Sequence, residues 1–354
     1  MKTSHPSYHL KNIRHYYGSK KVLDIDDLKI KTGSITGLLG PNGSGKSTLL
    51  KLLAFAGKPT YGQIFYKGRP EVPFSPGIRS KVTLLTQKPY LLKRTVFDNI
   101  AYGLKIRNDK TNLEQRIKEA LLNVGLDYQS FAPRKWHELS GGEAQRVAMA
   151  ARLILKPEIL LLDEPIASVD TKSAKLIRKA SLNARKNWGT TLVIASHDLQ
   201  WLYSISDIQL AIFRGTVFST GMENILTGPF EKSDPKTLVK ILGDGQRIIL
   251  KAPDRHSDTA LIRKKNICID LEKQSGASMG KQPDKGNRSD KDNKLSGHIA
   301  SMLLEKKSGH IMVAISIHDI SFTLRLAPDQ TRKMDLYPGK SIVLKFHSKN
   351  TEWL

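Results

Sequence analysis

The spacing of apolar residues changes several times along the chain, and each change marks a segment with a different predicted structure. Residues 7–31 alternate apolar and polar positions around a turn, which predicts antiparallel strands. Residues 34–39 form an apolar run typical of a buried strand, and residues 49–55 place apolar side chains on one face of a helix. Residues 159–162, Ile-Leu-Leu-Leu, predict a parallel strand buried on both faces. The first part of the chain is therefore predicted to be an α/β unit.

A helical region interrupts this alternation. Over 96–126 apolar residues recur at spacings of three and four, which favours a mostly helical insertion that extends over about 96–142. A helix over 171–187 and a strand over 190–195 then resume the earlier pattern. A terminal hairpin about Arg214-Gly215 closes this first unit near residue 221.

The organisation changes beyond residue 221, where short β-like segments are separated by turns and no helix is expected. Residues 273–294 have almost no apolar content and are predicted to be a disordered insertion. The predicted strands of this second part are 238–242, 247–251, 259–269, 298–305, 310–317, 321–326 and 341–346. We therefore expect two domains, 1–221 and 222–354, the second a small all-β, barrel-like domain.

Composition narrows the class of protein. The chain has 354 residues, 39% hydrophobic and 25% charged, which is typical of a globular protein with room for two domains. No apolar run approaches the roughly 18 residues needed to cross a bilayer, and the first residues lack the apolar core of a secretory signal. A single cysteine, Cys268, permits no internal disulfide and fits a reducing cytoplasm. We expect Cys268 to be a buried strand residue.

The formal net charge of +24 favours an anionic partner, which could be nucleic acid, a membrane surface or an anionic ligand. The basic residues are spread along the chain, and no RNA-binding signature or tract of interleaved aromatic residues is present. We therefore expect no nucleic-acid partner. A solvated basic surface near membrane lipids is the favoured interpretation.

A phosphate-binding loop provides the most specific chemistry in the sequence. Its residues are Gly40, Pro41, Asn42, Gly43, Ser44, Gly45, Lys46, Ser47 and Thr48. The strand before it and the helix after it are the context that this motif requires, so a chance glycine-rich turn is disfavoured. Gly43 and Gly45 allow backbone N–H groups to turn toward phosphate oxygens. Lys46 would reach the β and γ phosphates, and the Ser47 hydroxyl would bind Mg²⁺.

Three further segments carry polar groups where ligands bind in such sheets. Residues 139–146, Leu-Ser-Gly-Gly-Glu-Ala-Gln-Arg, predict a second helix start that faces phosphate. Asp163 and Glu164 follow a buried strand directly, at the edge where parallel sheets hold ligands. His197 also follows a predicted strand, although a single histidine there is more often structural. Tyr17, before the Gly18 turn, is a candidate to stack on adenine, with a plain strand aromatic as the alternative.

Taken together, these motifs and their order resemble those of the ATP-binding subunit of ABC transporters, over residues 1 to about 221. The resemblance implies a P-loop ABC ATPase domain with a RecA-like core, an antiparallel β subdomain and a helical subdomain. It implies that Gln87 senses the γ-phosphate and Mg²⁺, that Asp163 holds Mg²⁺, and that Glu164 polarises the attacking water. His197 would steady the γ-phosphate, as positioning and charge stabilisation dominate phosphoryl transfer.

The same resemblance implies a working homodimer. One chain contains one phosphate loop and one Leu-Ser-Gly-Gly-Glu segment. Ser140, Gly141, Gly142 and Glu143 would bind the ATP of the other subunit, and Asp170 would belong to the loop that contacts the dimer partner. The implied partners are an integral-membrane permease and an extracytoplasmic substrate-binding protein, with this chain at the cytoplasmic face of the membrane.

Residues 52–55 and 84–100 resemble the tungstate and molybdate importer branch of that family. The tail resembles the TOBE and MOP type β domains appended to the ATPases of anion importers. The Lys-Ala-Ser of molybdate-binding domains appears here as Lys345-Phe346-His347-Ser348, so no residue of the tail is assigned as an anion ligand.

Three alternatives stay open from the sequence. The chain could be the ATPase of another ABC importer, for sulfate, iron or polyamine, because the hydrolytic residues would be the same. It could be an anion sensor whose tail regulates the ATPase. A soluble ABC protein of translation or DNA repair is disfavoured, because such proteins usually carry two cassettes or a long coiled coil.

Overall fold

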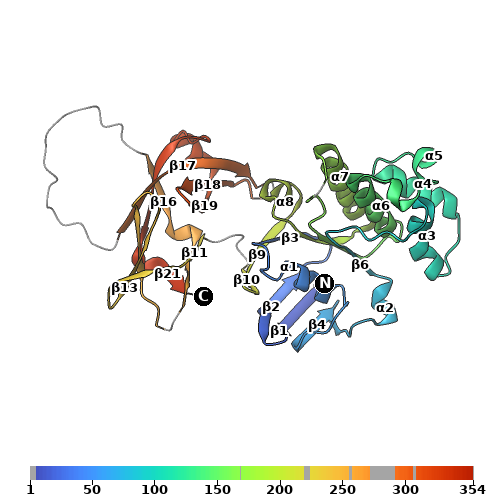
Figure 1. The fold of residues 1–354 in the computed structure, drawn as a ribbon, viewed down its shortest axis with the longest axis horizontal. Coiled ribbons are helices and arrows are strands. Elements are labelled where there is room, and N and C mark those ends of the chain that lie inside the picture. The colour runs from blue at the N-terminus through green and yellow to red at the C-terminus, as the bar shows by residue number, and fades with distance from the viewer. Residues whose placement is uncertain are drawn as a thin grey trace. The chain divides into compact units, whose positions relative to one another are not determined.

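The computed structural model describes residues 5–167, 169–218, 224–254, 257–271, 292–305 and 308–353. The chain divides into two compact units, Met1–Gly221 and Met222–Leu354. Figure 1 shows the elements of both units. Within the described ranges, no helix is long and apolar enough to span a bilayer.

Ten strands of the first unit, among the described residues, form one sheet in the order β5-β4-β1-β2-β10-β9-β3-β8-β7-β6. One end is antiparallel and the other, from β9 to β6, is parallel. The strands are β1 (Tyr8–Tyr17), β2 (Lys20–Ile30), β3 (Ile35–Leu39), β4 (Tyr61–Tyr66), β5 (Arg69–Pro70), β6 (Val82–Leu85), β7 (Ile159–Asp163), β8 (Thr191–Ala195), β9 (Ile208–Phe213) and β10 (Thr216–Phe218). The predicted α/β organisation of the first unit is confirmed, and β7 is buried at all five positions.

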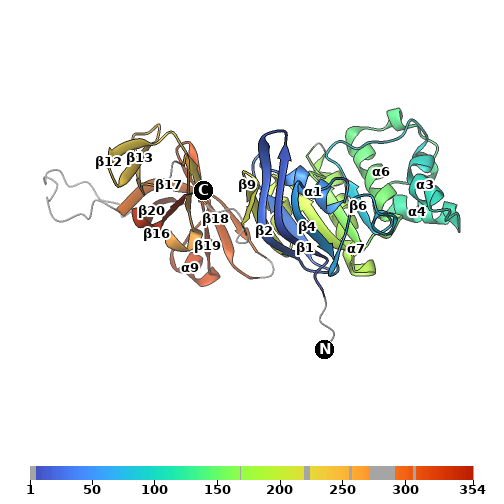
Figure 2. The ribbon, with the colours of Figure 1, turned by 90° about the horizontal axis from the view of Figure 1, so that it is seen from below.

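Helix α1 follows the phosphate loop and fills the core beneath the antiparallel strands, beside β1, β2 and β4 (Figure 2). Its leucines pack with Tyr8, Leu10 and Ile13 of β1 and with residues of β7 and β8. The helices of this unit are α1 (Lys46–Leu53), α2 (Pro76–Arg79), α3 (Val96–Ile106), α4 (Leu113–Asn123), α5 (Tyr128–Phe131), α6 (Gly141–Leu153), α7 (Thr171–Trp188) and α8 (Leu199–Ile205), with a 3₁₀ turn at Trp136–Glu138. Helix α8 was not predicted, although Asp198 caps it by accepting a hydrogen bond from the Trp201 N–H at 2.8 Å.

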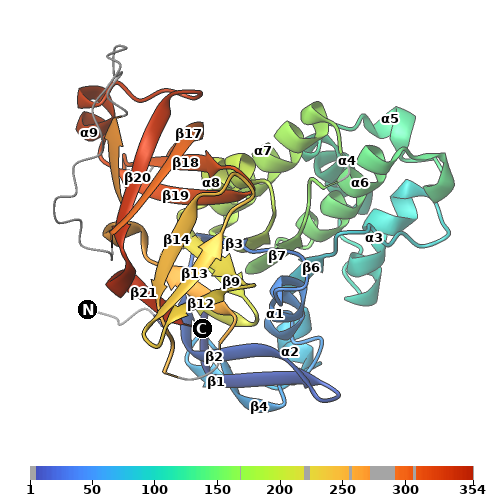
Figure 3. The same ribbon diagram turned by 60° about the vertical axis from the view of Figure 1, so that its left-hand side comes forward.

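The described part of the second unit contains three antiparallel sheets around one apolar core, and Figure 3 shows β17 to β20 of the largest. Their orders are β11-β15-β21, β12-β13-β14 and β16-β20-β17-β18-β19. The strands are β11 (Asn224–Thr227), β12 (Glu231–Asp234), β13 (Thr237–Ile241), β14 (Arg247–Lys251), β15 (Thr259–Ile262), β16 (Cys268–Leu271), β17 (Asp292–Leu304), β18 (Ile311–Ile317), β19 (Ile320–Leu326), β20 (Ser341–His347) and β21 (Thr351–Trp353). The strands of the predicted β domain are confirmed.

Two buried asparagines join these sheets. Asn224 of β11 accepts a hydrogen bond from the Thr323 N–H of β19 at 2.5 Å and donates to the Thr323 carbonyl at 3.1 Å. Asn293 of β17 accepts from the Ile249 N–H of β14 at 2.6 Å and donates to its carbonyl at 2.8 Å. Each asparagine therefore satisfies the backbone of a strand in another sheet.

The expectation that the second unit has no helix is wrong. Helix α9 (Pro328–Lys333) begins with proline at its first position, and the Gln330 side chain accepts a hydrogen bond from the Ala327 N–H at 3.0 Å. Short 3₁₀ turns also occur at Lys264–Asn266 and Ser348–Asn350, and the first of them interrupts the strand predicted over 259–269.

Two other expectations for the second unit need correction. Cys268 lies in strand β16 as predicted, but it is exposed, because it pairs with Lys345 of β20 and shares that residue's outer face of the sheet, opposite to the buried Leu344 and Phe346. Of the disordered insertion predicted over 273–294, residues 273–291 lie outside the described residues. Asp292, Asn293 and Lys294 instead begin β17 and pair with β20.

Candidate functional site

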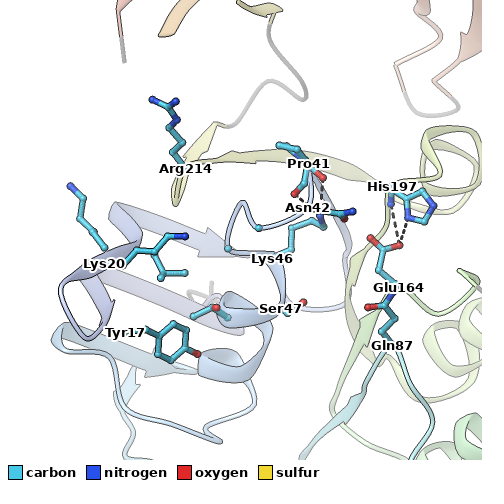
Figure 4. Close-up of a pocket in the computed structure, with 16 residues that line it drawn as sticks. Tyr17, Lys20, Pro41, Asn42, Lys46, Ser47, Gln87, Glu164, His197 and Arg214 are labelled. Atoms are coloured by element: carbon cyan, nitrogen blue, oxygen red, sulfur yellow. Dashed lines mark hydrogen bonds and ion pairs between the residues drawn. The ribbon is translucent and has the colours of Figure 1, made fainter. Parts of the chain in front are cut away.

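A cavity of about 1230 Å³ lies in the first unit where the two parts of its sheet meet (Figure 4). It is lined by Tyr17, Lys20, Lys21, Val22, Gly40, Pro41, Asn42, Gly43, Gly45, Lys46, Ser47, Thr48, Gln87, Glu164, His197 and Arg214. The phosphate loop joins β3 to α1 and forms one wall. Glu164 and His197 follow the neighbouring strands β7 and β8 and form another. The cavity is larger than most drug-sized ligand sites, so it has room for a nucleotide.

The phosphate loop is held in place by its own lysine. The Lys46 ammonium donates to the carbonyls of Gly40 at 2.7 Å and Pro41 at 3.0 Å. Burial lowers the pKa of Lys46, while the charges of Glu164 and Asp163 oppose this shift. A phosphate anion would compensate the cost of burying this cation.

Two buried atoms, one in the loop and one beside it, match the needs of a nucleotide and its metal ion. The Ser44 hydroxyl is buried and has no hydrogen-bond partner among the described residues, and the same holds for Asp163 Oδ1. Burial raises the pKa of Asp163, and a hydrogen bond with Ser47 opposes this. Carboxylate and hydroxyl oxygens are hard ligands that suit Mg²⁺. Within the described ranges, no group of three or more His, Cys, Asp or Glu side chains is arranged so that it could hold a metal ion by itself.

Glu164 and His197 are directly joined. The His197 ring Nδ1 and its backbone N–H lie 2.8 Å and 3.2 Å from the same oxygen, Glu164 Oε2. Glu164 is 7% exposed, whereas 64% of the His197 side chain is accessible. The φ angle of Glu164 is +47°, which is strained for a residue with a side chain. In this conformation Glu164 follows the end of β7 and lines the cavity.

The structure separates the second predicted phosphate-facing segment from the cavity. Ser140, Gly141, Gly142 and Glu143 do not line it. Ser140 caps α6: its hydroxyl accepts from the Glu143 N–H at 3.3 Å, and Glu143 accepts from the Ser140 N–H at 2.8 Å.

Asp170 lies next to that segment. It caps α7 by accepting from the N–H and the hydroxyl of Ser173 at 2.9 and 2.8 Å, and these bonds lower the pKa of Asp170. A Cβ atom at Gly142 would lie 3.3 Å from the Asp170 carboxylate, so the starts of α6 and α7 are neighbours.

Sequence reasoning missed several residues of the cavity wall. Lys20, Lys21 and Val22 begin β2, and Arg214 lies in the turn between β9 and β10. Both turns were predicted, but their meeting at the phosphate loop depends on the order of strands in the sheet. Together with Lys46 they surround the cavity with positive charge, which suits a polyphosphate.

Fold and cavity together define a P-loop nucleotide-binding protein. A family model described as ABC transporter matches residues 23–167. The tungstate uptake system ATP-binding protein of Peptoclostridium acidaminophilum is 38% identical over 197 residues, which cover 55% of this chain and 89% of that protein. The chain therefore belongs to the family of ABC transporter ATP-binding proteins. The predicted family, the ATPase activity and the use of ATP with Mg²⁺ are confirmed.

Other relatives act on different cargo. A spermidine/putrescine import ATP-binding protein of Spiroplasma citri is 34% identical over 266 residues, 74% of this chain and 73% of that protein. An Fe(3+) ions import ATP-binding protein of Vibrio cholerae is 35% identical over 215 residues, 60% of each chain. Several other polyamine-import relatives are covered over only 60–63% of their length.

Solved structures support the same assignment. A dimeric bacterial ABC transporter cassette matches with a TM-score of 0.56 and 28% identity, over 59% of this chain and 96% of that one. The same cassette in a post-hydrolysis state with ADP and phosphate matches with a TM-score of 0.55 and 28% identity, over 59% of this chain and 96% of that one.

Proposed function

We propose that this chain is the ATP-hydrolysing subunit of an ABC importer for a tetrahedral oxyanion, tungstate or molybdate. It works as a homodimer at the cytoplasmic face of the membrane, with an integral-membrane permease and an extracytoplasmic substrate-binding protein. The similarity to a tungstate uptake ATP-binding protein, at 38% identity, supports this cargo. The resemblance of residues 84–100, around Gln87, to the same branch agrees with it.

The contact between Glu164 and His197, opposite the phosphate loop, is the observation that supports hydrolysis here. Glu164 Oε2 accepts from His197 and is aimed into the cavity, so the carboxylate is positioned to polarise a water. His197 would contact the γ-phosphate through its exposed ring edge. Gln87 lies on the same wall, where it senses the terminal phosphate. Tyr17, at the far end, would stack on the adenine.

Lys46, Ser47 and Asp163 would hold the charged end of the nucleotide. Lys46 would leave the carbonyls of Gly40 and Pro41 for phosphate oxygens, while Ser47 and Asp163 hold Mg²⁺. When bound, the metal ion neutralises charge on the phosphate oxygens. The protein therefore contributes positioning and electrostatic stabilisation.

The separation of the two phosphate-facing segments supports the homodimer. Ser140 to Glu143 lie outside the cavity of their own chain, which leaves them available to the nucleotide of a second copy. Asp170 beside Gly142 would belong to the same contact. The likeness to a dimeric cassette agrees with this arrangement.

Lys46→Ala tests the nucleotide site. Removing a buried cation that binds phosphate should weaken ATP binding about 10- to 100-fold, as expected for a charge-assisted hydrogen bond. Lys58→Ala, an exposed lysine outside the cavity, is the matched control. Binding of a fluorescent ATP analogue to the full chain measures both variants. Equal affinity of Lys46→Ala and the parent would contradict the proposed site.

Polyamine import is a second candidate that one observation favours. The match to the Spiroplasma citri protein spans 266 residues, so it is longer than the first unit and reaches into the second. The match to the tungstate protein spans 197 residues, fewer than the first unit contains.

Uptake separates the two cargoes. Cells that lack this chain should lose accumulation of tungstate and molybdate and keep that of spermidine, putrescine, iron and sulfate. Loss of spermidine uptake with normal tungstate uptake would replace the proposed cargo by the second candidate. Reintroducing the chain with Lys46→Ala should not restore transport, whereas the Lys58→Ala chain should.

A further inference from the structure

The turn between β9 and β10 is hydrogen-bonded to the phosphate loop. The Gly215 N–H donates to the Ser44 carbonyl at 2.9 Å, and the Gly215 carbonyl accepts from the Asp24 N–H of β2, also at 2.9 Å. Strand β10 pairs with β9 through Thr216 and Phe213. Gly215 is more than 160 positions from the phosphate loop in the sequence. Its two hydrogen bonds therefore link the loop to β2, at the turn that follows β9.

Only glycine fits at this position. The φ angle of Gly215 is +83°, and a Cβ atom there would lie 2.4 Å from the Val22 carbonyl oxygen and 2.8 Å from the Leu23 Cα. The phosphate loop also packs closely against β9, because a Cβ atom at Gly40 would lie 2.2 Å from the Ile212 carbonyl oxygen. These contacts are with backbone atoms, which cannot move aside as a side chain would.

The Gly215 hydrogen bond sets the direction of one phosphate-binding group. Ser44 C=O and Gly45 N–H belong to the same peptide unit, which is planar and trans, so they point in opposite directions. Because Gly215 holds the Ser44 carbonyl, the Gly45 N–H points the other way. Gly45 lines the nucleotide cavity, so its N–H is available to a phosphate oxygen there.

We propose that Gly215 is a positioning residue for the phosphate end of ATP: it fixes the Ser44–Gly45 peptide so that its N–H is presented to phosphate before the nucleotide arrives. The proposal rests on the nucleotide site proposed above. Preorganisation of this kind lowers the ordering cost of binding, so its loss raises the dissociation constant and the KM for ATP more than it lowers kcat.

Gly215→Ala in the full chain is the first test, with Gly189→Ala as its control. Gly189 has a similar φ of +68°, but a Cβ there would meet no atom within 4 Å, so it carries the strain without the link to the loop. We expect Gly215→Ala to weaken binding of a fluorescent ATP analogue and of tripolyphosphate at least about tenfold, as for the loss of a phosphate-binding group. Gly189→Ala should leave both affinities and the KM for ATP within twofold of the parent.

A second variant removes the hydrogen bond alone. Glycolic acid incorporated at position 215 replaces the N–H by an ester oxygen and adds no atom that could clash. Loss of one neutral hydrogen bond should weaken ATP and tripolyphosphate binding about 2- to 12-fold. This variant keeps the test decisive if Gly215→Ala does not fold.

The outcomes separate this inference from the proposed site. An ester variant that binds ATP and tripolyphosphate as the parent does, while Lys46→Ala loses both, would overturn the role of Gly215 and leave the site intact. Full binding by the ester variant and by Lys46→Ala would overturn the site itself. Parallel losses in the two variants support the inference.

Discussion

The two units treat their buried polar atoms differently. Among the described residues, all buried side-chain polar atoms that lack a hydrogen-bond partner lie in the first unit. They belong to His15, Ser44, Thr83, Gln145, Arg146 and Asp163. In the second unit, Asn224 and Asn293 are as deeply buried, yet each bonds both N–H and C=O of a neighbouring strand.

This difference between the units is related to the candidate nucleotide site. An unpaired buried polar atom costs about 1–3 kcal/mol, so natural structures keep few of them. Ser44, in the phosphate loop, and Asp163, beside it, lie where a nucleotide and its metal ion would satisfy them. Two of the unpaired groups of the first unit therefore belong to the candidate site, whereas Asn224 and Asn293 find their partners inside the second unit.

The largest expected effect concerns the first unit, which contains the candidate nucleotide site. Glu164→Gln should reduce ATP turnover at least about a hundredfold, because an amide cannot act as a base toward water. ATP binding should persist, since Lys46 and Asp163 remain. Phosphate release and nucleotide binding measure the two effects.

Glu158→Gln, at the opposite end of the same strand, is the matched control for Glu164→Gln. Glu158 accepts a hydrogen bond from the Tyr66 hydroxyl at 2.8 Å and does not line the cavity. Its loss should lower stability modestly and leave turnover near the parental rate. Turnover of Glu164→Gln at the parental rate would show that another group activates water.

Two deletions test how self-contained the second unit is. Removing 273–291, replaced by a short Gly-Ser linker, should leave the free energy of unfolding nearly unchanged, because so polar a segment buries little apolar surface. Removing 273–294 also deletes Asn293 and its two bonds to Ile249, and should cost about 2–4 kcal/mol. Chemical denaturation measures both. Equal stability of the two deletions would mean that Asn293 contributes nothing.

Asn224→Ala removes the other connection between sheets. The Thr323 N–H and C=O would lose their partner, which should cost about 1–3 kcal/mol of unfolding free energy. Affinity for ATP should not change. Asn266→Ala, at a half-buried asparagine in a 3₁₀ turn, should stay within about 0.5 kcal/mol of the parent. A weaker ATP affinity in Asn224→Ala alone would contradict the division between the units.

Gln145→Met tests a buried polar side chain that has no hydrogen-bond partner among the described residues. Both amide atoms of Gln145 are buried without partners among the described residues, so an apolar side chain of similar size should leave the nucleotide-free chain equally stable or stabilise it by about 1 kcal/mol. Gln129→Met, on the exposed surface of α5, is the control. A loss of more than about 1 kcal/mol would show that the amide is satisfied in solution.

The smallest effect concerns an exposed ion pair in the second unit. Arg263 donates to Glu352 at 2.6 and 2.7 Å, and this lowers the pKa of Glu352. Its stabilisation is therefore present above the ordinary glutamate pKa of about 4.3 and is lost as pH falls through the lowered value. Both side chains are more than 40% exposed, so Glu352→Gln should cost less than about 1 kcal/mol at pH 7 and nothing at about pH 2. A cost that does not depend on pH would point to packing instead.

Local sequence patterns predicted most of the first unit. The phosphate loop, β7 and the carboxylates after it follow from short motifs and from continuous apolar runs. Helix α8 was missed because it has only seven residues, although its cap, Asp198, was visible. Helix α9 was missed for the same reason, since its six residues make fewer than two turns and leave little periodicity.

Features that depend on distant parts of the chain could not be predicted. The exposure of Cys268 follows from its pairing with Lys345 on the outer face of the sheet, which joins residues far apart in the sequence. Lys20 and Arg214 reach the cavity only because β2, β10 and β9 are neighbours in the sheet. The contact between Glu164 and His197 likewise depends on the pairing of β7 with β8.

The exposed edge position of Cys268 makes the chain convenient for spectroscopy. It is the single thiol of the sequence, so a maleimide dye or spin label would attach at one known place without prior mutagenesis. Because β16 belongs to the second unit, such a label reports on that unit while nucleotide binds in the first. In the proposed homodimer, distances between the labels of the two subunits would then follow the assembly through a cycle of ATP binding and hydrolysis.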